Sequence, residues 1–110
     1  MPQRFDLSVP ANRARLDAIE QLVKIAADAG LSMIQLALGF VVAHPGVTSA
    51  IIGPRTMDHL HSQLAAADTV LSPDVLDAVD AVVTPGLDLA PEEKIDTPPS
   101  LLDASLRRRR

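Results

Sequence analysis

The chain has 110 residues and a formal net charge of −4, and its only aromatic residues are two Phe. This length supports one domain, or part of one, and is too short for two. The acidic balance argues against a general affinity for nucleic acid or acidic membranes. The absence of Cys excludes disulfides and thiolate metal sites. Neither a signal peptide nor an apolar run of membrane length is visible, so we expect a cytoplasmic protein with no nucleic-acid or membrane partner.

The first half of the chain predicts two helices after an extended lead-in. Asn12 is a suitable N-cap for a helix that carries one apolar stripe and ends at Gly30. Ser32 is a suitable N-cap for a second helix, from Met33 to about Ala43. This second helix is apolar on nearly every face, and we therefore expect it to be buried against several neighbours.

A short strand and two further helices are predicted in the second half. Residues 47–52 are rich in β-branched side chains and bounded by Gly on both sides, which is typical of a buried parallel strand. Thr56 can cap the next helix, which would continue to Asp68 with Leu60, Leu64 and Ala67 on its inner face. The last helix would open at Ser72-Pro73 and end at Pro85-Gly86.

The C-terminal part differs in character from the rest. Residues 87–110 are interrupted by prolines and show no apolar period, so we predict an irregular tail after a folded part that spans residues 1–86. The tail ends in four arginines, Arg107–Arg110. They are either a solvated end or a clamp on a phosphate or an acidic partner.

The turn that leaves the predicted strand is the one place where the sequence points to chemistry. A strand that ends at Gly53 and opens a helix brings unpaired backbone N–H groups and the positive end of a helix dipole to one spot, beside Arg55. This arrangement suits a phosphate. A structural turn whose arginine faces water fits the local sequence equally well.

A single strand cannot form a sheet, because its N–H and C=O groups need partners on both edges. Residues 49–52 are therefore either an extended linker in an all-helical fold or one strand of a sheet whose other strands lie elsewhere. We favour the second interpretation, because a strand followed by a helix is typical of the end of a βα array.

The run from Leu36 to Thr56, followed by His59-Leu60, residues 63–66 and Leu71-Ser72, resembles the C-terminal part of the aldo-keto reductases. The likeness is strongest over residues 22–86. Members of this family are (β/α)8 barrels that transfer a hydride between NADP(H) and a carbonyl or an alcohol. The resemblance implies the α/β class, with this chain as the C-terminal part of a TIM barrel that is mostly α-helical and has one short strand.

The resemblance also implies a cofactor site. In the family, the loop after the eighth strand and the helix that follows bind the adenosine 2′-phosphate and the adenine of NADP(H). By position, Gly53, Pro54 and Arg55 would lie along the 2′-phosphate, with Arg55 supplying charge. The residues expected to face the adenosine are His59, Ser62 and Gln63. Positions 55, 59 and 63 are four apart, so from a helix start at 56 they would present one line of side chains, with 62 beside it. The family often has Gln, Glu and Asn at these three positions, so the adenine contacts depart further from its pattern than the phosphate contacts.

The catalytic group of the family is absent. That group is an Asp, a Tyr, a Lys and a His on early strands, and this chain has no tyrosine. We therefore expect no activity from the chain alone, with a separate polypeptide as the possible source of the rest of the barrel. His44 fits a structural helix end, and His59 and His61 face different directions on a helix, so no metal site is predicted.

Two other classes of protein fit parts of the sequence. A helix-turn-helix regulator fits the turn at Gly30, but its recognition helix would be residues 33–43, which contain no Lys or Arg to reach phosphates or bases. A small helical interaction module without a ligand is the remaining alternative. In that case Arg55 is a surface charge and the predicted strand is a linker.

Overall fold

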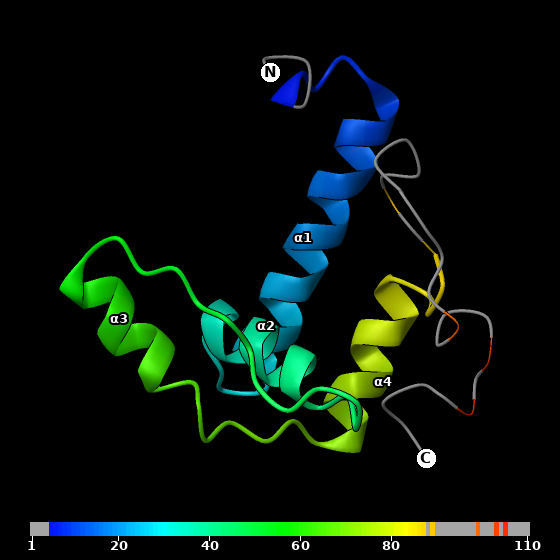
Figure 1. The fold of residues 1–110 in the computed structure, drawn as a ribbon. Coiled ribbons are helices and arrows are strands. Elements are labelled where there is room, and N and C mark those ends of the chain that lie inside the picture. The colour runs from blue at the N-terminus through cyan, green and yellow to red at the C-terminus, as the bar shows by residue number, and fades with distance from the viewer. Residues whose placement is uncertain (1–4, 88, 90–98, 100–102, 104, 106–110) are drawn as a thin grey trace.

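The computed structural model describes residues 5–87, 89, 99, 103 and 105, and this part of the chain contains four helices and no strand (Figure 1). The helices are α1 (Pro10–Asp28), α2 (Met33–Val42), α3 (Met57–Leu64) and α4 (Pro73–Val82). No single described helix is long and apolar enough to cross a membrane; α1 and α2 pass that test only as a pair, which is bent by 94°. The arginines at 107–110 lie outside the described residues.

The first helix begins two residues before the predicted N-cap. Val9 occupies the N-cap position in an extended conformation, and Pro10 is the first helical residue. Proline suits this position because its φ is preset and its missing N–H would have no helical partner. Asn12 was therefore wrongly predicted as the cap. It is buried inside the first turn, where its Nδ2 donates a hydrogen bond to the carbonyl of Asp6 at 2.9 Å.

The connection between α1 and α2 follows the prediction. Gly30 has a φ of +69°, and Leu31 N donates to Ala26 O at 2.8 Å while Gly30 N donates to Ala27 O at 3.0 Å. This is the paired hydrogen-bond pattern of a Schellman motif. Ser32 then caps α2 through a reciprocal capping box with Gln35. The two helix ends are thus fixed by local hydrogen bonds that the sequence identifies.

Replacing Gly30 with Ala is expected to lower the free energy of unfolding by about 1 kcal/mol, because a Cβ is disfavoured in the left-handed conformation. A Cβ built at Gly30 meets no atom within 4 Å, so the cost is conformational and not steric. Urea unfolding followed by circular dichroism measures the change. Gly53→Ala is the matched control: a Cβ there also meets nothing within 4 Å and its φ is not in the left-handed region, so no comparable loss is expected.

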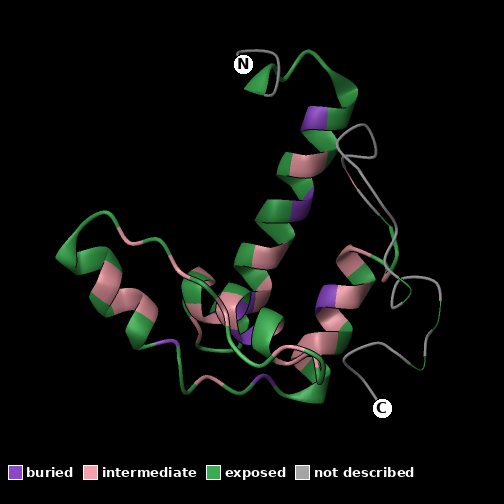
Figure 2. Cartoon of the chain, in the orientation of Figure 1, coloured by how far each residue is buried: buried purple, intermediate pink, exposed green. Residues whose placement is uncertain are grey.

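The core lies where α1, α2 and α4 meet, below the middle of the long helix in Figure 2. Its buried members are Ala26, Leu36, Leu71 and Val79. Gly39 allows the chain before α4 to approach α2, since a Cβ at this position would lie 3.1 Å from the side chain of Leu71. The core is thin, and within the described residues no large side chain is completely buried.

The prediction that α2 is buried on several sides is wrong for this structure. Only Leu36 and Gly39 are buried in α2, and the exposed large side chains on its other faces are Ile34, Val41 and Val42. The reason is that the described chain covers the helix on part of its surface only, from α1, α3, α4 and residues 69–71. An apolar helix surface is left facing outward.

The two later helices keep their predicted caps. The hydroxyl of Thr56 accepts a hydrogen bond from His59 N, and the hydroxyl of Ser72 accepts one from Val75 N, with Pro73 at the first position of α4. However, α3 ends at Leu64 instead of Asp68. Its continuation tightens into i to i+3 hydrogen bonds. The residues predicted for the inner face of α3 are also less covered than expected, since Leu64 and Ala67 are exposed and Leu60 is half-buried.

The predicted strand does not form. Residues 48–54, called the extended segment below, are neither helical nor paired as a strand, and none of the backbone N–H groups from Thr48 to Thr56 donates a hydrogen bond within the part of the chain that is described. Strand geometry requires a paired neighbour, and this part of the chain contains none. Ile51 is fully exposed as a result. The sequence therefore carries a strand pattern, and the structure has an unpaired extended segment in its place.

Candidate functional site

The predicted cofactor residues lie on one connected element, the end of the extended segment and α3. Figure 1 shows this element (green) standing away from α1 and α4, and it contacts α2. No residue of α3 is buried. Gly53 and Arg55 are exposed, and Pro54 is half-buried. All six predicted residues therefore fall within one short stretch at the surface.

The start of α3 presents backbone donors. The N–H groups of Met57 and Asp58 have no hydrogen-bond acceptor within the described residues, because the first helical bond is made by Leu60 N to Thr56 O at 3.1 Å. Together with the free N–H groups of the extended segment, they point to a place where an anion can be held. Asp58 also lies in this first turn, where its carboxylate interacts favourably with the helix dipole and opposes a bound phosphate.

Arg55 does not lie on the helix. Thr56 is an extended N-cap with φ of −132° and ψ of 163°, so α3 starts at Met57 and not at the predicted position 56. The expected single line of residues 55, 59 and 63 is therefore incorrect for Arg55, which precedes the helix. His59 and Gln63 remain four apart on α3 and share a face. Arg55 is exposed and directly precedes the N-cap residue of α3.

Ser62 and Gln63, which are predicted to face the adenosine, differ in the hydrogen bonding of their side chains. The hydroxyl of Ser62 donates a hydrogen bond to the carbonyl of His59 at 2.9 Å, so it is engaged with its own helix. The Oε1 atom of Gln63 is buried and has no hydrogen-bond donor, and it is the one such side-chain atom among the described residues. A buried acceptor without a donor costs free energy until a donor reaches it.

These residues fit the adenosine end of NADP(H) in their chemistry. Arg55 and the free backbone N–H groups are donors suited to a 2′-phosphate. The unsatisfied oxygen of Gln63 is buried, so in this structure it is not open to an adenine amino group. Gly53 leaves its backbone open, since a Cβ there would meet nothing within 4 Å. Ser62 and Asp58 fit less well, for the reasons given above.

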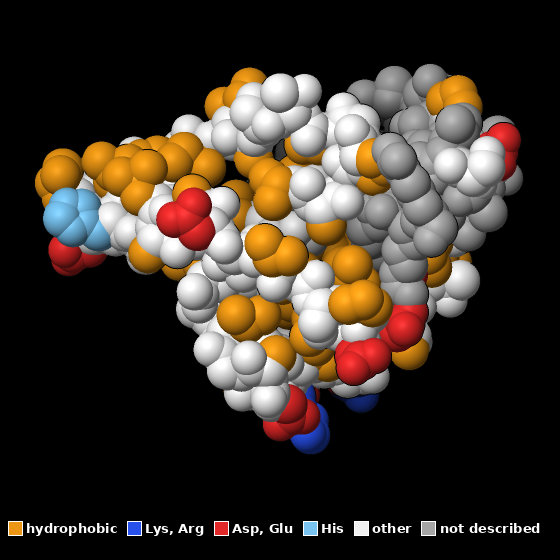
Figure 3. All heavy atoms as spheres, turned by 90° about the horizontal axis from the view of Figure 1, so that it is seen from below, with side chains coloured by type: hydrophobic (Ala, Val, Ile, Leu, Met, Phe, Trp, Pro, Cys, Tyr) orange, Lys and Arg blue, Asp and Glu red, His pale blue; other side chains and the backbone are white. Residues whose placement is uncertain are grey.

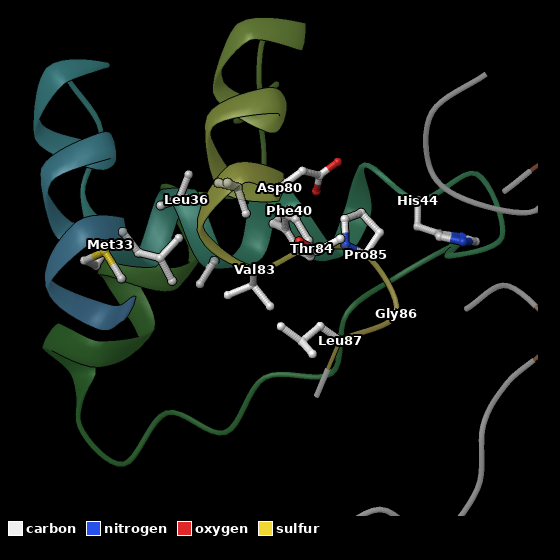
Figure 4. Close-up of a pocket in the computed structure, with 13 residues that line it drawn as sticks. Met33, Leu36, Phe40, His44, Asp80, Val83, Thr84, Pro85, Gly86 and Leu87 are labelled. Atoms are coloured by element: carbon white, nitrogen blue, oxygen red, sulfur yellow. The ribbon is translucent and has the colours of Figure 1, made fainter. Parts of the chain in front are cut away.

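A second feature of the surface was not predicted from the sequence. An apolar groove of about 490 Å³ lies between α1, α2 and the end of α4 (Figure 4). It is lined mainly by Leu22, Met33, Leu36, Phe40, Val83 and Leu87, and no predicted cofactor residue borders it. The apolar periods of the helices were visible in the sequence, but they were assigned to a filled core. Which faces fail to meet depends on tertiary packing.

Comparison with known proteins decides the family. The profile described as Aldo/keto reductase family matches residues 2–84, which is most of the chain. The chain belongs to the aldo-keto reductase family. Membership implies a (β/α)8 barrel, to which the described part of this chain contributes helices only. No solved structure matches the chain significantly.

Individual relatives agree with this assignment. Protein tas of Escherichia coli strain K12 is 40% identical over 65 residues, which are 59% of this chain and 19% of that protein. A protein named probable voltage-gated potassium channel subunit beta, from Oryza sativa subsp. japonica, is 33% identical over 79 residues, which are 66% of this chain and 24% of the relative. The chain thus spans about a fifth to a quarter of the length of the curated relatives it matches.

Proposed function

We propose that residues 53–63 form the adenosine end of an NADP(H) site, and that the chain is a C-terminal segment of an aldo-keto reductase without turnover of its own. The observation that carries the proposal is the junction before α3, where an exposed Arg55 stands next to backbone N–H groups that have no acceptor. The match to the family over residues 2–84 supports the choice of NADP(H) as the anion.

Each predicted residue has a role at the site. Arg55 pairs with the 2′-phosphate, and the free N–H groups at the start of α3 add hydrogen bonds to the same group. Gly53 and Pro54 shape the loop so that its backbone approaches the ligand. His59, Ser62 and Gln63 border the nucleoside. When bound in a complete barrel, NADPH supplies the hydride that reduces a carbonyl, and none of these residues takes part in that transfer.

The extended segment before the proposed site lacks the neighbouring strands that it would have in a barrel. Its N–H and C=O groups have no hydrogen-bond partner among the residues that the structure describes, and Ile51 is fully exposed, whereas a barrel strand has neighbours on both edges. Apolar side chains also spread over α3 and the central face of the molecule in Figure 3. A polypeptide that carries the preceding part of the barrel is the partner that would cover these groups.

Titration of the purified chain with NADP+ and NAD+ tests the cofactor assignment. The two ligands differ only by the 2′-phosphate, so chemical-shift changes at Gly53, Arg55 and Met57 are expected with NADP+ and not with NAD+ at the same concentration. Binding should be weak, because the nicotinamide half of the site is not supplied by these residues. Equal responses to both ligands would contradict recognition of the 2′-phosphate at Arg55. No response to either would contradict the proposal and favour an interaction module without a ligand.

The expected lack of turnover is tested separately. The chain contains no tyrosine to donate a proton to a carbonyl oxygen. Oxidation of NADPH with an aldehyde substrate should stay at the background rate, as followed by absorbance. A rate above background that co-purifies with the chain would overturn this part of the proposal and leave the binding assignment standing.

A further inference from the structure

We propose that the peptide bond between Arg55 and Thr56 is a cleavage site for a serine endopeptidase whose specificity pocket carries a carboxylate and therefore selects basic residues. The enzyme takes the extended segment and Arg55 into its cleft as a strand. The open backbone before the bond, the exposed arginine and the short helix after the bond support this assignment, which holds whether or not residues 53–63 bind a nucleotide.

The backbone before this bond has no hydrogen bonds to lose when it enters a cleft. An extended peptide is recognised through main-chain hydrogen bonds to a neighbouring strand and through pockets for its side chains. In residues 48–55, no backbone N–H donates and no carbonyl accepts a hydrogen bond within the described chain. Gly53 leaves room for a second strand, since a Cβ there would meet no atom within 4 Å. Pro54 disfavours the helical conformation at Gly53, so this part of the chain suits the extended form that the cleft requires.

Arg55 is the basic side chain that this open backbone presents, and it is exposed. An arginine in the specificity pocket pairs with the carboxylate there through two parallel hydrogen bonds. The other basic residues in the described part of the chain are Arg13, Arg15 and Lys24, and all three lie within α1. A cleft can reach the backbone at these positions only after the helix has opened. Among the described residues, an open backbone and a basic side chain therefore coincide at Arg55 alone.

The chain after the bond opens more easily than α1 does. Thr56 is already extended, and the N–H groups of Met57 and Asp58 have no acceptor among the described residues. The helix that must fray, α3, has eight residues, none of them buried, and a helix of this length is marginal by itself. In Figure 1 it stands away from α1 and α4. By contrast, α1 has 19 residues and contributes Ala26 to the core, so opening it disrupts tertiary packing.

Cleavage of this bond is an acyl transfer to water. The serine hydroxyl of the enzyme adds to the carbonyl carbon of Arg55, and the nitrogen of Thr56 leaves with the hydroxyl proton. Water then hydrolyses the acyl-enzyme, which frees a carboxylate on Arg55 and restores the serine. The new ammonium group of Thr56 lies at the N-terminal end of α3, where it opposes the helix dipole. The cut therefore destabilises α3 and separates it from Arg55.

Limited digestion of the full chain with trypsin, followed by mass spectrometry of the fragments, tests the assignment. Fragments that end at Arg55 and fragments that begin at Thr56 are expected before any cut after Arg13, Arg15 or Lys24. Arg55→Gln should abolish these fragments, and Arg55→Lys should retain them, because the pocket accepts either cation. Arg13→Gln is the matched control: it removes the same charge from α1 and should leave the rate of cleavage after Arg55 unchanged.

Two synthetic peptides separate the openness of the backbone from the sequence preference of the enzyme. One spans residues 48–62 and the other spans residues 18–30, around Lys24, and both serve as unfolded references. The bond after Arg55 should be cut in the chain at a rate within about tenfold of that in its peptide, because proteolysis follows the population of the open form. The bond after Lys24 should be cut more than about 100-fold more slowly than in its peptide. Equal ratios at the two bonds, or an intact bond after Arg55 when α1 has been cut, would overturn the proposal.

Discussion

Replacing Arg55 with Ala is expected to weaken binding of NADP+ by about 10- to 100-fold, because a charge-assisted hydrogen bond to a phosphate contributes about 1.5 to 3 kcal/mol. Binding of NAD+ should not change, since that ligand has no 2′-phosphate. The side chain is exposed and precedes α3, so its removal leaves the helix and its Thr56 cap intact. Chemical-shift titration of the variant with both nucleotides measures the two affinities.

Two matched variants separate charge from position. Arg13→Ala removes the same charge from α1, where its guanidinium bonds only to the carbonyl of Leu7, and should leave NADP+ binding unchanged. Arg55→Lys keeps the charge but loses the planar pair of donors, so an intermediate affinity is expected. If Arg13→Ala and Arg55→Ala weaken NADP+ equally, the attraction is only a general effect of net charge and the assigned site is wrong.

Helix ends were predicted well because they depend on neighbouring residues. The caps at Ser32, Thr56 and Ser72 each use a side-chain oxygen that accepts from an N–H three residues later. Gly30 likewise acts through bonds within a few residues of itself. The one cap that was misplaced, at Asn12, shows the limit of this reasoning. Its side chain found a carbonyl six residues upstream instead, and Pro10 started the helix.

Burial and strand formation were predicted poorly because they depend on distant segments. The apolar faces of α2 indicate several neighbours, and the pattern of residues 47–52 indicates a paired strand. Neither is satisfied by the described chain, and both are satisfied by a barrel. These two errors have the same cause: burial and strand pairing depend on segments that are distant in sequence, and the chain spans only about a fifth to a quarter of the length of the curated relatives it matches.

The sequence motif located the candidate site, whereas the hydrogen bonding of its side chains became visible only in the structure. The resemblance placed Gly53, Arg55 and Gln63 in one stretch, and that stretch is exposed at a helix N-terminus. The engaged hydroxyl of Ser62 and the orphaned oxygen of Gln63 required atomic positions. No short motif signals the apolar groove, since its lining comes from three helices that meet only in the folded chain.

The contrast between Leu36 and Ile51 tests whether the described fold is that of the isolated chain. Leu36 is 3% exposed and belongs to the core, so Leu36→Ala should lower the free energy of unfolding by about 2 to 5 kcal/mol through lost burial and the cavity left behind. Ile51 is fully exposed, so Ile51→Ala should change it by less than about 0.5 kcal/mol.

Urea unfolding of the two variants at several protein concentrations gives the comparison. Both are truncations of a large aliphatic side chain to Ala, and they differ in whether the described fold covers that side chain. A large cost for Ile51→Ala would mean that the extended segment is buried in solution. If that cost rises with protein concentration, the cover comes from another copy of the chain. If only Leu36→Ala is costly, residues 48–54 are open in the free chain and available to the strands of a barrel.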